Sequence, residues 1–138
     1  MRIRFAAFVA GLGLIVGVLP VAAHHSFNAE YDVQKPITLK GAVTKVEWKN
    51  PHTYFYIDVK DETGKITNWG LEMGSPNALM RAGWSRNSMK VGDEVVVEAS
   101  RAKDGSELGN VKAVTLSSTG QRLFGASSGT DQPETPVR

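Results

Sequence analysis

Short runs of alternating apolar and polar residues, separated by residues that favour turns, occupy most of the chain from Ile37 onward. The run at residues 53–59 has two distinct faces, with Phe55, Ile57 and Val59 on one and Tyr54, Tyr56 and Asp58 on the other. Such alternation is typical of half-buried β-strands, because successive side chains of a strand point to opposite faces. The sequence therefore predicts a mainly β protein.

The first strand is expected to begin at Ile37 and to bend. Its apolar positions slip by one residue between Val43 and Val46, which indicates a bulge near Thr44 and Lys45. A bulge lets one long strand take part in two sides of a small barrel.

Four further strands and one short helix follow in the sequence. The strands are expected at residues 53–59, 66–72, 94–101 and 110–116, with turns rich in Gly and Asp between them. Ser75 is a typical helix cap, Pro76 suits the first helical position, and Gly83 is a plausible end of the helix.

Three strands, a short helix and two strands form the β-β-β-α-β-β order of the five-stranded Greek-key barrel called the OB-fold. A split sheet packed on one helix would give a similar order. We expect an OB-like domain at residues 37–118 and a flexible tail at residues 119–138, which are rich in Gly, Ser, Thr and Pro. OB barrels bind ligands on strands 2 and 3 and in the neighbouring loops.

Residues 1–23 have the order of a secretory signal peptide. Arg2 and Arg4 form the charged start, residues 5–18 are apolar, and residues 21–23 are a small-residue cleavage site. An uncleaved membrane anchor is the alternative, because a spanning helix needs about 20 apolar residues. Pro20 and the small residues after it favour cleavage. We therefore expect a periplasmic or secreted protein with a short N-terminal segment at residues 24–36.

Length and charge exclude several other classes of protein. The 138-residue chain has a formal net charge of +2, and Arg2 and Arg4 supply this excess, so the chain after the leader is neutral. That length suits one domain. Nucleic-acid binding is not expected, since it needs clustered Lys and Arg. The chain has no cysteine, which excludes disulfides, thiolate metal sites and a lipid anchor on cysteine. No membrane contact is expected after cleavage.

Cleavage after Ala23 would make His24 the first residue of the mature protein. A terminal amine and an imidazole on one residue can chelate a divalent transition metal, and imidazole suits copper, zinc and nickel. Cleavage after Ala22 would give an Ala-His-His start, which also binds copper or nickel, although Pro20 makes this cut less favourable. We predict a copper site that uses His24 with His25 or His52. The alternative is that the histidine pair is a solvated linker.

His52 is the remaining histidine of the chain and follows Asn50-Pro51 between the first two expected strands. The residue before a proline is held extended, so the loop is stiff and fixes the direction of His52. Such a loop suits a ligand. In the alternative interpretation Pro51 sets a turn and His52 hydrogen-bonds a nearby carbonyl group.

A second hypothesis is a module that binds a peptide, a glycan or a small ligand without metal. Its expected site residues are Trp48, Asn50, Tyr54, Tyr56, Trp69 and Glu72. The aromatic rings would stack on the ligand, and the polar groups with His52 would add hydrogen bonds. If the Phe55 face fills the core, Tyr54 and Tyr56 point outward and favour a surface site. If the tyrosines point inward, they are packing residues.

No catalytic residue is predicted, because the chain has no nucleophile motif and no phosphate-binding loop. Ser26, Glu30 and Asp32 near the histidine pair are better explained as solvated polar residues. A binding protein is therefore favoured over an enzyme.

A set of short motifs runs along most of the chain after the leader: Ala23-His24-His25-Ser26-Phe27, Glu30-Tyr31-Asp32, residues 41–48, Asn50-Pro51-His52, Ser75-Pro76-Asn77 and residues 102–106. In these motifs the chain resembles an uncharacterised family of small exported bacterial proteins, a domain of unknown function. The resemblance implies export and a small β-rich domain, and it implies no particular ligand.

Overall fold

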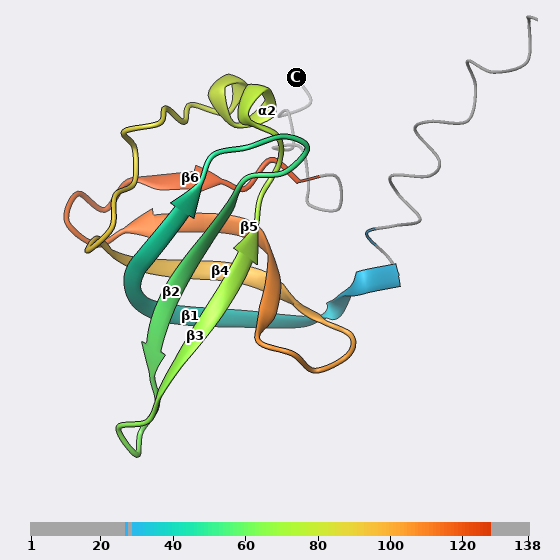
Figure 1. Ribbon diagram of the computed structural model, residues 1–138, viewed down its shortest axis with the longest axis vertical. Helices are drawn as coiled ribbons and strands as arrows, with labels where there is room; N and C mark the ends of the chain where they lie inside the picture. Colours follow the sequence, from blue (N-terminus) through green and yellow to red (C-terminus); the bar gives the residue numbers. More distant parts are fainter. Residues whose placement is uncertain (1–26, 28, 128–138) are drawn as a thin grey trace, which may run out of the picture.

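The computed structural model describes residues 27 and 29–127 and shows one sheet with a short helix at its end (Figure 1). The elements are β1 (Tyr31–Glu47), β2 (Tyr54–Lys60), β3 (Ile66–Glu72), α2 (Pro76–Arg81), β4 (Glu94–Ala102), β5 (Leu108–Leu116) and β6 (Arg122–Phe124). The prediction of a mainly β chain with a short helix is confirmed. The expected signal peptide at residues 1–23 and the pair His24 and His25 lie outside the described residues.

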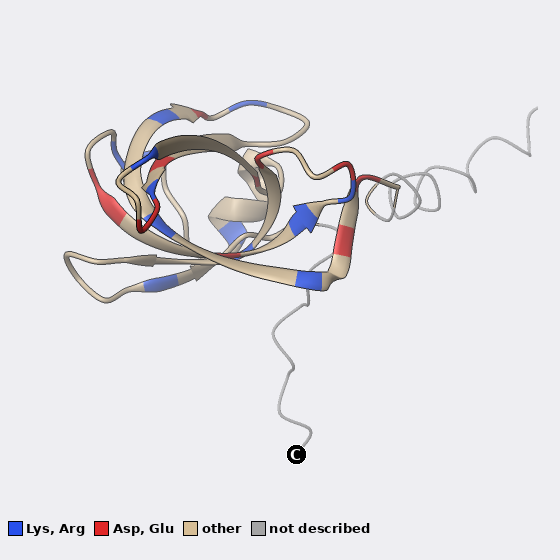
Figure 2. Cartoon of the chain, turned by 90° about the horizontal axis from the view of Figure 1, so that it is seen from below, with Lys and Arg blue, Asp and Glu red and all other residues tan. Residues whose placement is uncertain are grey.

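The strands form a closed ring. Their order in the sheet is β3-β2-β1-β4-β5-β6, and neighbours in this order are antiparallel. β3 also pairs with β5 in parallel, through residues 70–72 and 108–110, and this pairing closes the ring (Figure 2). The alternative of a split sheet is not formed, because all the described strands hydrogen-bond in one sheet.

β1 bends and takes part in two sides of the ring, as predicted. Its residues 31–42 pair with β4, and its residues 42–47 pair with β2. The register shifts between Val43 and Lys45, so the predicted bulge is confirmed. Gly41 lies beside this bend, where a β-carbon would be only 2.2 Å from the backbone oxygen of Asp58. β1 and β2 can therefore approach this closely only with glycine at this position.

The core fills the ring and continues under α2. Phe55 and Ile57 are fully buried, while Tyr54 and Tyr56 on the opposite face of β2 are half-buried. The Phe55 face is therefore the inner face of the ring, and the tyrosines point outward. Leu79 of α2 joins the same apolar cluster at one end of the ring (Figure 1).

Local sequence signals explain α2 and its boundaries. The Ser75 hydroxyl accepts a hydrogen bond from the Ala78 backbone nitrogen, and Pro76 occupies the first turn. Gly83 follows the helix with φ of +97°, a conformation that glycine adopts without strain. The predicted start and end of the helix are confirmed.

The sheet extends beyond both ends of the expected domain. β1 begins at Tyr31 rather than Ile37, and its register with β4 shifts between Asp32 and Pro36. Residues 32–36 are mostly exposed, so they show no apolar alternation. At the other end, a sixth strand, β6, lies inside the expected tail and pairs with β5. Its buried residue is Leu123, and one such residue gives too short a pattern to predict a strand.

Charged residues of both signs are spread around the outside of the ring (Figure 2). This distribution fits the neutral charge balance of the sequence after the leader. Among the helices of the described residues, none is long and apolar enough to cross a membrane.

Candidate functional site

His52 lies two residues before β2, where its imidazole is held on one side. The neighbouring residue Thr53 exchanges backbone hydrogen bonds with Met73 and Gly74, which fix this end of β2 against the segment after β3. The Nδ1 atom of His52 is 3.2 Å from the Met73 carbonyl oxygen and 3.3 Å from the Glu72 carboxylate oxygen Oε1. The alternative interpretation of His52, a hydrogen bond to a nearby carbonyl, is confirmed for this nitrogen.

The other ring nitrogen, Nε2, remains available for a ligand. A carbonyl oxygen and an ionised carboxylate are both acceptors, so Nδ1 carries the proton in the neutral imidazole and Nε2 keeps a lone pair. Within residues 27 and 29–127, no group hydrogen-bonds to Nε2. The His52 side chain is 37% exposed. The residue therefore has the orientation of a histidine that can bind a metal ion or a hydrogen donor.

Glu72 connects His52 to the start of the described chain. It ends β3 directly opposite Tyr54 of β2, and it is only 9% exposed. Its oxygen Oε2 accepts a hydrogen bond of 2.7 Å from the Tyr31 hydroxyl, while Oε1 faces His52. Burial of a carboxylate is costly unless it is hydrogen-bonded, so these contacts explain how Glu72 is accommodated.

Both tyrosines near Glu72 are held in their neutral form. Burial and the hydrogen bond to Glu72 raise the pKa of Tyr31 far above its usual range. Burial, followed by the charge of Glu72, raises the pKa of Tyr54 to about 12. The Glu30 carboxylate contributes to both shifts. Near neutral pH the two hydroxyls are therefore hydrogen donors directed at a region of negative charge.

A small second apolar cluster anchors the N-terminal end of the described chain. It consists of Phe27, Tyr31 and Ala102, all buried. The rings of Phe27 and Tyr31 are 5.7 Å apart between centroids and tilted by 30°. The chain just before β1 is thus packed against the end of β4, next to Glu72.

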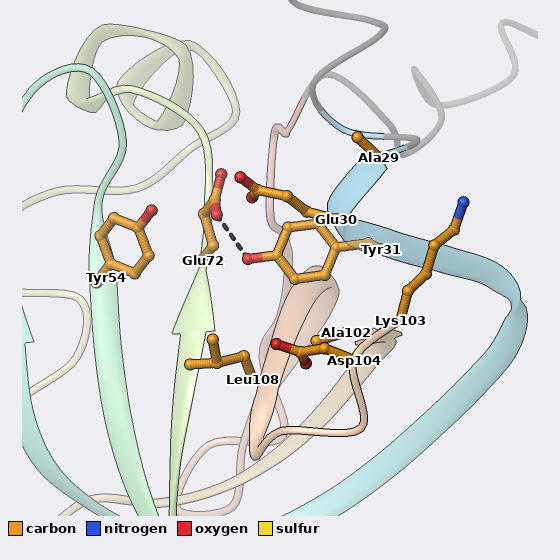
Figure 3. Close-up of a pocket in the computed structure, with 9 residues that line it drawn as sticks. All are labelled: Ala29, Glu30, Tyr31, Tyr54, Glu72, Ala102, Lys103, Asp104 and Leu108. Atoms are coloured by element: carbon orange, nitrogen blue, oxygen red, sulfur yellow. Dashed lines mark hydrogen bonds between the residues drawn. The ribbon is translucent and has the colours of Figure 1, made fainter.

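A cleft of about 570 Å³ lies between these elements (Figure 3). Tyr31 and Tyr54 stand on either side of Glu72. Asp104 comes from the β4–β5 connection, and Leu108 is the first residue of β5. Ala29, Glu30, Ala102 and Lys103 complete the lining. A cavity of this size with apolar walls and a few polar groups is typical of small-molecule sites.

The structure brings together only part of the site predicted from the sequence. Tyr54 and Glu72 line the cleft, and His52 lies beside Glu72. Tyr56 is one step further along β2 on the same face, with the Lys45 amine 5.5 Å from its ring centre. Asn50 is exposed in the loop before β2, and its peptide bond to Pro51 is cis.

The two tryptophans of the predicted site lie elsewhere. Trp48 is half-buried against the main core and borders a small hollow beside Trp84. Trp69 is on the inner face of β3, opposite Ile57, and the Arg101 guanidinium lies 5.3 Å from its ring centre. Both therefore serve packing in the described part of the chain, although the strand pattern alone makes them equally plausible as stacking residues.

A comparison with protein families identifies the family of the chain. A family described as "Family of unknown function (DUF6152)" matches residues 13–112. The chain belongs to this family. A comparison of the DUF6152 chain with curated proteins gives no match.

The family match covers β1 to β4 and the first residues of β5, so it contains all the residues that line the cleft of this DUF6152 protein. The described residues contain no group of three or more His, Asp or Glu side chains that could hold a metal ion by themselves. Of the predicted metal ligands, only His52 is described; His24 and His25 lie outside the described residues.

Sequence reasoning did not predict the part of the site contributed by Tyr31, Glu30 and Leu108. Tyr31 lies in a polar segment before the first apolar alternation, so no strand pattern indicated it. The one available signal was its place in the Glu30-Tyr31-Asp32 motif.

Proposed function

We propose that this protein is an exported binding protein that holds one copper ion between His52 and a mature N-terminal His24, with His25 as an alternative ligand. The observation that carries the proposal is the orientation of His52. Glu72 and the Met73 carbonyl engage Nδ1, so Nε2 is the ring nitrogen that has no hydrogen-bond partner among the described residues. Metal-binding histidines commonly donate their other ring nitrogen to a carboxylate or a backbone carbonyl in this way.

The anchoring of the chain before β1 supports the second half of the site. Phe27 packs on Tyr31, Tyr31 bonds Glu72, and Glu72 contacts His52. His25 precedes Phe27 by two residues, so chain geometry limits the distance between their α-carbons to about 7 Å. Phe27, which follows His24 by three residues, thus packs on the residue that bonds Glu72.

The chemistry of these donors favours copper. A terminal amine, its own imidazole and a second imidazole give three nitrogen donors, and copper(II) binds such nitrogen sets more tightly than the other divalent first-row metals. The proposal requires cleavage after Ala23, which the charged start, the apolar stretch and the small residues of the leader support. It places the protein in the periplasm or outside the cell.

The arrangement of the strands is consistent with this location of the site. We propose that the ring is an OB-like barrel, and the order β1-β2-β3-β5-β4 around it supports this. The usual ligand face of that fold is formed by strands 2 and 3 and the adjacent loops. Tyr54, Glu72 and His52 occupy this region.

Titration of the secreted, metal-free protein with copper(II), followed by calorimetry and electron paramagnetic resonance, tests the proposal. We expect one tight site with nitrogen hyperfine structure. Glu72→Gln should weaken binding about 10-fold to 100-fold, because it removes the partner that orients His52. His24→Ala and His52→Ala should each weaken binding more than Glu72→Gln does.

Two controls make the result specific. Glu62→Gln changes a carboxylate in the exposed β2–β3 turn, away from His52, and should leave copper binding unchanged. Acetylation of the terminal amine should weaken binding, because it removes the amine donor from the His24 chelate. Equal affinity of wild type and His52→Ala, or a secreted mass that includes the leader, would contradict the copper site.

A second candidate function is the binding of a small organic ligand without metal. The cleft of about 570 Å³ beside Tyr54 and Glu72 favours it. Ligand binding that persists in metal-free protein and in His24→Ala would separate this function from copper binding.

A further inference from the structure

The charges around the cleft are unequal. Glu30, Glu72 and Asp104 contribute three carboxylates to its lining, and Lys103 contributes one amine. Figure 3 shows the Lys103 amine on the far side of Tyr31 from Glu72. The centre of the cleft is therefore negative, although the sequence after the leader is neutral.

Glu72 has capacity for a further hydrogen donor. An ionised carboxylate offers about four lone-pair positions on its two oxygens. The Tyr31 hydroxyl occupies a position on Oε2 and His52 Nδ1 faces Oε1. The remaining positions on the carboxylate of this buried residue can accept bonds from a ligand inside the cleft.

The walls beside this carboxylate are apolar. Tyr31 and Tyr54 present rings on either side of Glu72 (Figure 3), and Leu108 is 43% exposed at the edge of the cleft. Aromatic ring faces attract cations as well as apolar groups. An anion in the cleft would meet the negative charges of Glu30, Glu72 and Asp104, whereas a cation would be attracted by them.

We propose that the cleft binds an organic cation, with an ammonium group at Glu72 and an apolar body against Tyr31, Tyr54 and Leu108. This inference rests on the second candidate function above and is independent of copper. The same chemistry would accept a free amine or the basic side chain of a peptide, and the cavity volume suits a ligand of a few tens of atoms at most.

Three probes of similar shape and different charge test the inference in metal-free mature protein: phenethylammonium, phenethyl alcohol and phenylacetate. Binding is followed by nuclear magnetic resonance shifts of the Leu108 methyl groups and the tyrosine rings. We expect the ammonium to bind at least about tenfold more tightly than the alcohol, because charge-assisted hydrogen bonds are the stronger ones. Phenylacetate should produce no saturable shift.

Variants then locate the charge effect. Glu72→Gln should weaken phenethylammonium binding about tenfold and should weaken phenethyl alcohol binding by a much smaller factor, because a neutral hydrogen bond is weaker than a charge-assisted one. Glu62→Gln, which removes the same charge from the distant β2–β3 turn, should change neither affinity. Circular dichroism checks that Glu72→Gln is folded. If the variant does not fold, the comparison of the three probes in the unmodified protein still tests charge selectivity.

The outcomes distinguish the inference of a cation site from the broader proposal of a small-ligand cleft. Equal binding of ammonium and alcohol would overturn the inference of a cation site while leaving a small-ligand cleft. An absence of binding by all three probes would overturn the inference, and copper binding in the separate titration would still stand. Equal weakening by Glu62→Gln and Glu72→Gln would show a general effect of net charge and would also overturn it.

Discussion

The Tyr31 hydroxyl donates a hydrogen bond of 2.7 Å to the Glu72 carboxylate, across 41 positions of the sequence. Both residues are at most 9% exposed. The bond joins the first residue of β1 to the last residue of β3 and so couples the start of the described chain to the cleft. A low local dielectric strengthens such a bond and makes its loss costly.

Tyr31→Phe should therefore destabilise the protein by about 1.5 to 3 kcal/mol, the range for a hydrogen bond to a charged group. The substitution keeps the ring and removes only the donor to Glu72. The measurement is the free energy of unfolding from urea denaturation followed by circular dichroism.

Tyr56→Phe is the matched control. Tyr56 is on the outward face of β2, and no described residue hydrogen-bonds its hydroxyl, so its loss should change stability by less than about 0.5 kcal/mol. Equal destabilisation by the two variants would mean that the hydrogen-bonded hydroxyl of Tyr31 stabilises the protein no more than the unpaired hydroxyl of Tyr56 does.

Gly41→Ala should destabilise the protein by at least about 3 kcal/mol, beyond the usual cost of overpacking. A β-carbon at Gly41 would be 2.2 Å from the Asp58 oxygen and 2.9 Å from its carbonyl carbon, and backbone atoms there cannot move without disturbing the β1–β2 pairing. Thermal and urea unfolding measure the effect.

Gly105→Ala separates this clash from backbone strain. Gly105 has φ of +80° and no atom within 4 Å of its added β-carbon, so its cost is only that of the left-handed conformation, about 1 kcal/mol. A smaller loss for Gly41→Ala than for Gly105→Ala would contradict the close approach of β1 and β2.

The parts of the fold with strong local signals were predicted well from the sequence. The predicted strand at residues 66–72 matches β3, and the Ser75 cap, Pro76 and Gly83 define α2. The bulge near Thr44 could be predicted because the alternation of apolar and polar residues shifts by one position there. Each of these features depends on residues that are close together in the sequence.

The features that were missed depend on partners distant in the sequence. β6 is a strand because Arg122, Leu123 and Phe124 pair with residues 113–115 of β5, and three residues carry no readable period. Tyr31 is a site residue because of Glu72, and no local pattern connects them. The parallel pairing of β3 with β5, which forms one wall of the cleft, is likewise a long-range contact.

The aromatic residues illustrate why composition did not identify the site. Tyr54 and Tyr56 were expected to point outward if Phe55 filled the core, and this condition is met. Only Tyr54 lines the cleft, because Glu72 is its cross-strand partner and the chain before β1 covers that end of the strand pair. The position along the strand, rather than the residue type, decides which ring has a role.

Thr53→Val should stabilise the protein by about 1 kcal/mol. Thr53 is fully buried, and its hydroxyl has no hydrogen-bond partner among the described residues. Leaving a buried polar group unpaired costs about 1 to 3 kcal/mol, and valine has the same branched shape without the hydroxyl. The free energy of unfolding in urea measures the change.

Thr44→Val is the opposite case on a neighbouring strand. The Thr44 hydroxyl donates to the Tyr56 carbonyl oxygen at 3.3 Å and accepts from the Asn68 amide at 3.1 Å. Its removal should destabilise the protein by about 0.5 to 1 kcal/mol. If Thr53→Val is the more destabilising of the two, the Thr53 hydroxyl has a partner after all, for example a bound water.

The Glu47 carboxylate should give the protein a pH-dependent stability in acid. Lys45 at 2.6 Å and then Lys49 at 3.0 Å lower the pKa of Glu47 from 4.5 to about 2. A lowered folded-state pKa means that the stabilisation is complete above pH 4.5 and is lost as the pH falls toward 2. We therefore expect Glu47→Gln to lower the melting temperature at pH 7 and to have no effect near pH 2.

High salt should reduce the difference in melting temperature between wild type and Glu47→Gln at pH 7, because the lysines are more than half exposed. Nuclear magnetic resonance titration of the Glu47 carboxyl measures its pKa directly, and a midpoint near 4.5 would contradict the ion pairs.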